Sequence, residues 1–127
     1  MNKDDLKNKL DEIKVEDFIW VIYIGIIFLS YYANSLETKY YLNNDFKSKE
    51  KYRQIMIFIF IILIIVYGYF LKSSLNDVKN LKPNDSDKKK LLVYASFLGS
   101  LLIFISGLIF LLIAISDENL DVELAFN

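Results

Sequence analysis

The sequence predicts an all-α integral membrane protein with three transmembrane helices, of which the second and third form an antiparallel hairpin. Three stretches, 18–36, 54–71 and 91–116, contain no Asp, Glu, Lys or Arg. Mean hydropathy is +0.31 although 24% of the residues are charged, so charged and apolar residues occupy separate parts of the chain. At about 1.5 Å of rise per residue, each stretch extends about 27 Å or more, against a hydrocarbon core of about 30 Å.

The composition allows a single membrane domain, 1–127, and excludes most catalytic chemistry. The chain has 127 residues, no Cys and no His. It therefore lacks disulfides, thiolate nucleophiles, thiolate or imidazole metal ligands and imidazole acid–base catalysis. Its acidic residues lie outside the three uncharged stretches and show no recognisable spacing. We expect a protein that is not an enzyme, with no catalytic, cofactor-binding or metal-binding residues.

Residues 1–17 are predicted to form a short amphipathic segment before the first span. Leu6, Leu10 and Ile13 recur there at helical spacing among charged residues. Four Lys and six acidic residues precede the apolar stretch, whereas a signal peptide begins with net positive charge. We therefore interpret 18–36 as a retained first span. The loop that follows is expected at 37–53, and the helix is expected to extend into it as far as about Tyr41.

The second span, 54–71, is apolar on nearly every side. Its run 55–66, IMIFIFIILIIV, contains no polar residue, whereas a helix of a soluble bundle keeps one polar face. Residues 72–90 are expected to form a helical hairpin tip that turns at Pro83, which cannot donate a helical hydrogen bond. Ser86 or Asp87 is the predicted N-cap of the third helix, which contains the third span, 91–116.

The distribution of basic residues predicts the orientation. Residues 1–17 carry four Lys and 72–90 carry six, against five basic residues in 35–53 and none in 117–127. The positive-inside rule then places the N-terminus and the hairpin tip in the cytoplasm and the C-terminus on the extracytoplasmic side. The acidic tail, 117–127, alternates apolar and polar residues. It is expected to be a solvated tail or, alternatively, a strand that adds to the sheet edge of a partner.

Small and hydroxylated residues occupy one face of the third span. At about 100° per residue they fall within an arc of about 140°. Because lipid tails are as apolar as Leu, helices in membranes associate through such close-packing faces. We expect this face to receive large side chains of the second span or of another copy of the chain. Its residues are Ala95, Ser96, Gly99, Ser100, Ser106, Gly107 and Ala114.

A narrower polar stripe follows the first span at helical spacing. We expect it to pack against the other helices; the alternative is that it lines a wet groove. A transporter would place an ionisable group in mid-membrane, and the spans contain none other than tyrosine. The residues of the stripe are Tyr23, Ser30, Asn34 and Glu37.

These patterns favour a non-enzymatic membrane protein that acts as an accessory, assembly or interaction subunit. The alternative is a small homo-oligomeric pore-forming or membrane-permeabilising protein, similar to holins in size and number of spans only. The expected partners are the lipid bilayer and either further copies of the chain or another membrane protein. Nucleic acid is not expected as a partner, because the basic residues are dispersed among acidic ones.

The predicted topology can be tested directly because the chain has no Cys. Single cysteines at Ser86 and Asn127 are expected to react with a membrane-impermeant thiol reagent from opposite sides of the membrane. A cysteine at Ser48 should label from the same side as the one at Asn127. Equal labelling of Ser86→Cys and Asn127→Cys from one side would contradict three spans.

Overall fold

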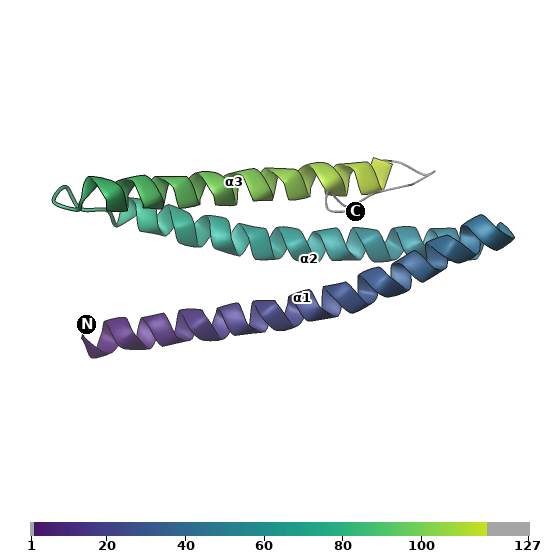
Figure 1. Ribbon diagram of the computed structural model, residues 1–127, viewed down its shortest axis with the longest axis horizontal. Coiled ribbons are helices and arrows are strands. Elements are labelled where there is room, and N and C mark those ends of the chain that lie inside the picture. Colours follow the sequence, from purple (N-terminus) through teal and green to yellow (C-terminus); the bar gives the residue numbers. More distant parts are fainter. Residues whose placement is uncertain (1, 117–127) are drawn as a thin grey trace. The chain divides into compact units, whose positions relative to one another are not determined.

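The computed structural model describes residues 2–116, which form three α-helices (Figure 1). These are α1 (Lys3–Asn43), α2 (Phe46–Lys79) and α3 (Asp87–Ser116). The all-α class predicted from the sequence is confirmed. The chain divides into two compact units, Met1–Ile55 and Met56–Asn127, and each is described by itself. The acidic tail, 117–127, lies outside the described residues.

The helix α1 is continuous from its N-terminal cap through the predicted first span. The Asn2 side-chain oxygen accepts a hydrogen bond from the backbone N–H of Asp5 at 2.8 Å, which satisfies one of the free donors of the first turn. Residues 2–18 are all exposed. The predicted amphipathic segment is therefore the first part of α1 and not a separate helix.

The connection between α1 and α2 is much shorter than the loop expected at 37–53. Between these two helices only Asn44 and Asp45 are not helical. Asn44 ends α1 in the left-handed region, with φ of 52°, which Asn tolerates better than most other residues. The Asp45 carboxylate accepts hydrogen bonds from the N–H groups of Lys47 and Ser48 at 3.2 and 3.3 Å, and so caps α2. Two adjacent capping residues thus reverse the chain, and the charged residues around them remain helical.

Aromatic and cationic side chains join the end of α1 to the start of α2. The Tyr40 ring packs edge-on against Phe46, with ring centres 5.7 Å apart, and the Lys49 ammonium lies 5.1 Å from the centre of the same ring. The Lys51 ammonium lies 5.3 Å from the centre of the Tyr32 ring. Each cation–π contact at an exposed site contributes about 0.5–1 kcal/mol. These contacts hold the two helices antiparallel beside the turn.

The second unit is an antiparallel hairpin of α2 and α3 (Figure 1), and the predicted contact between these helices is confirmed. The Phe60 ring of α2 stacks on Phe110 of α3, with ring centres 5.9 Å apart, and Phe104 packs over Gly68. Covered residues of α3 recur at alternating steps of four and three, the spacing of knobs-into-holes packing. We call this row the seam; it consists of Val93, Phe97, Ser100, Phe104, Gly107, Leu111 and Ala114.

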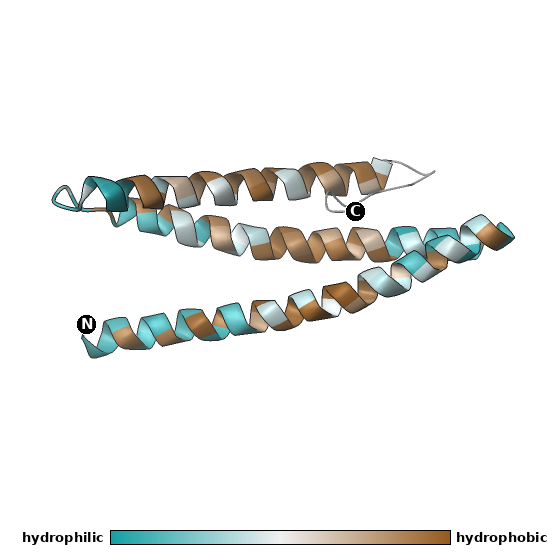
Figure 2. Ribbon diagram, viewed as in Figure 1, coloured by the Kyte–Doolittle hydropathy of each residue, from teal (hydrophilic) through white to brown (hydrophobic). Residues whose placement is uncertain are grey.

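Of the described helices, α2 and α3 are long and apolar enough to cross a membrane, by length and composition. Each carries a long hydrophobic stretch (Figure 2), which contains the predicted span 54–71 or 91–116. The predicted first span, 18–36, lies within α1, which is not one of these two helices. Tyr, Ser and Asn side chains are mixed with the apolar residues of that stretch.

Gly107 lies at a close contact between the two hairpin helices. A Cβ atom there would lie 3.2 Å from the Tyr67 ring and 3.3 Å from the Ile64 side chain. Gly107→Leu is therefore expected to push the helices apart and to lower the free energy of unfolding of the hairpin by about 1–3 kcal/mol, as overpacking does. Unfolding followed by circular dichroism in detergent micelles measures this change.

Gly99→Leu is the matched control for Gly107→Leu. Among the described residues, nothing lies within 4 Å of a Cβ atom built at Gly99. The control should leave the stability of the isolated hairpin nearly unchanged. Equal destabilisation by the two substitutions would show that the seam is not where the structure places it.

Candidate functional site

The predicted close-packing face of α3 divides into two narrower faces. At about 100° per residue, Ser96, Ser100, Gly107 and Ala114 fall within one arc of about 40°, and the remaining three residues fall within another. Ser100, Gly107 and Ala114 belong to the seam, at intervals of seven residues, and Gly107 and Ala114 are buried. This first face therefore packs on α2 along most of its length.

The second face lies outside the seam. It consists of Ala95, Gly99 and Ser106, all of which are exposed. Ser96 is also exposed, because it lies near the tip of the hairpin. We call Ala95, Gly99 and Ser106 the outer face of α3. The sequence alone did not separate the two faces, because only about 60° of helix rotation lies between them.

The predicted polar stripe of α1 is not uniform in its exposure. Tyr23 is half-buried and packs edge-on against Trp20, with ring centres 5.7 Å apart. Ser30 and Glu37 are half-buried, whereas Asn34 is exposed. The structure therefore gives Asn34 a different environment from the other three residues of the stripe.

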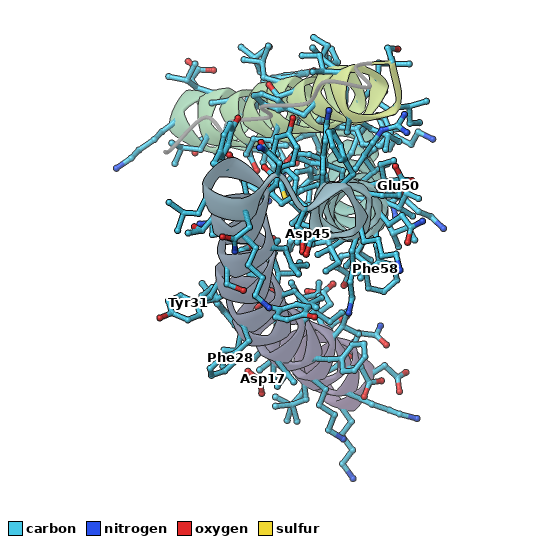
Figure 3. The ribbon with its side chains drawn as sticks, turned by 90° about the vertical axis from the view of Figure 1, so that its right-hand side faces the viewer. Asp17, Phe28, Tyr31, Asp45, Glu50 and Phe58 are labelled. Carbon is cyan, nitrogen blue, oxygen red and sulfur yellow. The ribbon has the colours of Figure 1, made fainter. Side chains whose placement is uncertain are left out.

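A shallow groove follows the exposed part of the stripe, lined by Tyr31, Asn34, Ser35 and Thr38. Tyr31 projects away from the axis of α1 (Figure 3) and is 80% exposed. The Ser35 hydroxyl donates to the carbonyl of Tyr32 at 2.6 Å, and the Thr38 hydroxyl donates to the carbonyl of Asn34 at 2.9 Å. Both hydroxyls thus donate to backbone carbonyls of α1. They are not free to donate to a ligand in the groove.

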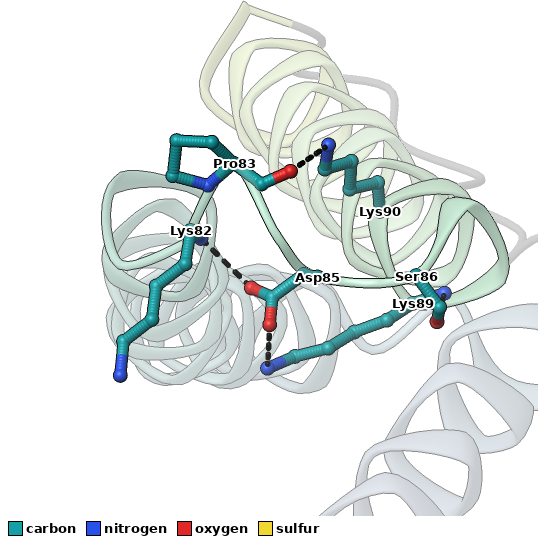
Figure 4. Close-up of polar contacts among 6 residues, drawn as sticks. All are labelled: Lys82, Pro83, Asp85, Ser86, Lys89 and Lys90. Atoms are coloured by element: carbon teal, nitrogen blue, oxygen red, sulfur yellow. Dashed lines mark hydrogen bonds and ion pairs between the residues drawn. The ribbon is translucent and has the colours of Figure 1, made fainter.

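The tip of the hairpin is organised by Asp85 (Figure 4). Its carboxylate accepts the backbone N–H of Lys82 at 2.7 Å and the ammonium of Lys89 at 3.2 Å. The Lys90 ammonium donates to the carbonyl of Pro83 at 3.1 Å. The hydrogen bond from the Lys82 N–H is the main cause that lowers the pKa of Asp85 below its usual value, and the Lys89 ammonium lowers it further. One carboxylate therefore joins the turn to the first turn of α3.

The N-cap of α3 is Ser86, one of the two residues predicted for it. The Ser86 hydroxyl oxygen accepts the backbone N–H of Lys89 at 3.1 Å, and its carbonyl accepts the N–H of Lys90. The central role of Asp85 was not predicted from the sequence. The available signal was the run of four turn- and cap-forming residues after Pro83, which did not show which of them would bridge the turn.

A groove of about 360 Å³ opens beside this tip, between the end of α2 and the start of α3. The groove is shallow and open to the surroundings over most of its surface. Charged and hydroxyl side chains line one part of the groove, and aliphatic side chains line another part. We call it the tip groove; it is lined by Asp77, Ser86, Lys88, Lys89, Leu92, Val93 and Ser96.

Within residues 2–116, no group of three Asp or Glu side chains could hold a metal ion. In comparisons with known proteins, no family model matches the chain, and no curated protein or solved structure matches it. The features that remain as candidates are the outer face of α3 and the tip groove. The first suits contact with another helix, and the second combines positive charge with an apolar wall.

The role of Asp85 can be tested by acid titration. A carboxylate with a lowered pKa in the folded state stabilises the fold at pH above its unfolded value of 3.8, and this stabilisation is lost as the pH falls through the lower, folded value. The backbone amide signal of Lys82 in NMR spectra should therefore titrate with a midpoint below 3.8. Asp85→Asn should abolish this titration, and Asp77→Asn should leave it in place. An unchanged titration in Asp85→Asn would contradict the hydrogen bond.

Proposed function

We propose that the chain is a non-enzymatic integral membrane protein with three spans that acts as an accessory, assembly or interaction subunit. In this proposal the outer face of α3 binds another helix within the membrane, and a second copy of the chain is the simplest partner. The observation that supports it is the division of the small residues of α3. One set packs against α2, and the other set is left exposed.

The physical argument rests on what drives association in lipid. Exposed Leu and Ile side chains gain little by leaving lipid for a protein surface, so apolar exposure alone predicts no partner. Close approach of two backbones does bring a gain in packing, and small residues four apart permit it. Ala95 and Gly99 have this spacing, and Ser106 continues the same face seven residues later. Space for a Cβ atom at Gly99 is open, so the backbone of α3 is accessible there.

The lengths of the helices support α1 as the first span. The uncharged stretch of α1 ends at Leu36, seven residues before the end of the helix, and that of α2 begins at Gln54, eight residues after its start. Both stretches therefore lie about 11–12 Å along their helices from the two-residue turn. Antiparallel helices with this arrangement would enter the hydrocarbon core at the same level. The proposed orientation keeps the N-terminus and the hairpin tip in the cytoplasm, as the distribution of Lys predicts.

Self-association in bilayers tests the proposal. Full-length chains carrying donor and acceptor fluorophores are reconstituted in liposomes, and energy transfer is measured as the lipid-to-protein ratio rises. Gly99→Leu is expected to weaken the dimer by about tenfold, because a large side chain at a close contact holds the backbones apart. Gly25→Leu is the matched control, since among the described residues nothing lies within 4 Å of a Cβ atom at Gly25 either.

If the partner of α3 is a different membrane protein, the same three proteins give a different result. The wild type would then remain monomeric, and extraction in mild detergent would recover a membrane protein whose yield falls in Gly99→Leu and not in Gly25→Leu. A wild type that is monomeric and has no companion sensitive to Gly99→Leu would overturn the proposal. Each variant must stay in the membrane fraction after alkaline extraction, which confirms insertion.

A further inference from the structure

We propose that the tip groove binds the headgroup of an anionic phospholipid, with part of the lipid tail along the apolar wall of α3. This proposal rests on the membrane location proposed above. It follows from three observations on the hairpin: the register of α2 against α3, the chemistry of the groove lining, and the charge balance of the tip.

The register places an apolar part of α3 beside a charged part of α2. Gly68 lies against Phe104, and stepping along the antiparallel pair brings Asp77 beside Ser96, where both line the tip groove. The uncharged stretch of α2 ends at Leu71, whereas that of α3 begins at Leu91. About ten residues of α3, or about 15 Å of helix, are therefore apolar alongside the charged end of α2.

Figure 2 shows the same offset along the hairpin. The hydrophobic colour of α3 begins near the tip, next to the hydrophilic end of α2. Leu91, Leu92 and Leu98 in this part of α3 are 68%, 58% and 55% exposed. If the hydrocarbon core is set by 54–71 of α2, these side chains stand at the level of the headgroups. A lipid that occupies the groove would cover apolar surface there which bulk hydrocarbon would not reach.

The lining of the tip groove changes from charged to apolar along α3. Lys88 and Lys89 stand at its outer end, and Leu92, Val93 and Ser96 follow one and two turns further toward the membrane. A ligand that fits this lining has a negative charge at one end and hydrocarbon at the other. Anionic phospholipids have this construction, and basic sites between membrane helices bind such headgroups. Free phosphate would satisfy the lysines and leave the apolar wall uncovered.

The charges around the groove favour an anion. Residues 72–90 contain six Lys and three Asp. Asp85 is engaged by the Lys82 N–H and by Lys89, and Lys88 has no ion pair among the described residues. Asp77 is the acidic residue in the lining, which it shares with Lys88 and with Lys89, whose ammonium is paired with Asp85. The net positive charge of the tip lies where the headgroups of the cytoplasmic leaflet would be in the proposed orientation.

Lipid retention measured by native mass spectrometry tests the proposal. The full-length protein is purified in detergent with an equal mixture of phosphatidylglycerol and phosphatidylcholine, and bound lipid is counted on the intact protein. The wild type should retain phosphatidylglycerol preferentially. Lys88→Gln/Lys89→Gln should lower this preference by about 25-fold, since each Lys near an anionic headgroup contributes roughly fivefold to binding. Lys88→Gln alone, which leaves the Asp85–Lys89 pair intact, should lower it by about half as much on a logarithmic scale.

Lys3→Gln/Lys7→Gln is the matched control, because it removes the same charge from the exposed start of α1. It should retain the preference for phosphatidylglycerol. An equal loss in the control and the tip variant would overturn the proposal, because it would indicate attraction to net charge only. An unchanged preference in the tip variant would overturn it as well.

Two further measurements separate the possible causes of failure. Inorganic phosphate added as competitor should not displace the phosphatidylglycerol; displacement by phosphate alone would show a phosphate site and overturn the lipid assignment. Flotation of the wild type with liposomes tests membrane insertion independently. A protein that floats but shows no lipid preference contradicts only the tip site, whereas one that does not float contradicts the proposed membrane location too.

Discussion

The close approach of α2 and α3 at Gly107 is the contact on which the rest of the hairpin depends. Tyr67 and Ile64 occupy the space that a side chain at this position would fill. In lipid, this packing supplies stability that the hydrophobic effect supplies in water. The contact fixes both the rotation of α3 and its position along α2. The rotation leaves Ala95, Gly99 and Ser106 exposed, and the position along α2 creates the tip groove.

The two turns that connect the three helices each depend on the hydrogen bonds of one acidic side chain. Asp45 caps α2 through Lys47 and Ser48, and Asp85 joins Lys82 to Lys89. Each turn satisfies backbone groups at a helix end that would otherwise depend on water. Because the two turns are short, most of the 115 described residues are helical, in three helices of 41, 34 and 30 residues.

The features that could be predicted from the sequence are those determined by residues close together in the chain. The apolar runs of α2 and α3, the break at Pro83 and the cap at Ser86 each follow from neighbouring residues, and all are present in the structure. The loop expected at 37–53 is largely helical, because its charged residues are compatible with a helix and the stretch contains no Gly or Pro. The division of the small face of α3 depends on which neighbour packs against it. The sequence of a single helix does not contain that information. Nor did the sequence show that Asp85 would join the backbone of Lys82 to the side chain of Lys89.

The two-residue connection between α1 and α2 has a mechanical consequence. With only Asn44 and Asp45 between the helices, and with Tyr40 held by Phe46 and Lys49, the chain has no slack beside the turn. If α1 and α2 both span a membrane, as proposed, one helix cannot slide along the other beside this turn when the thickness of the bilayer changes. In that case the protein would adapt by tilting or by extending its lysine side chains toward the headgroups, and its preferred tilt would report the thickness of the membrane.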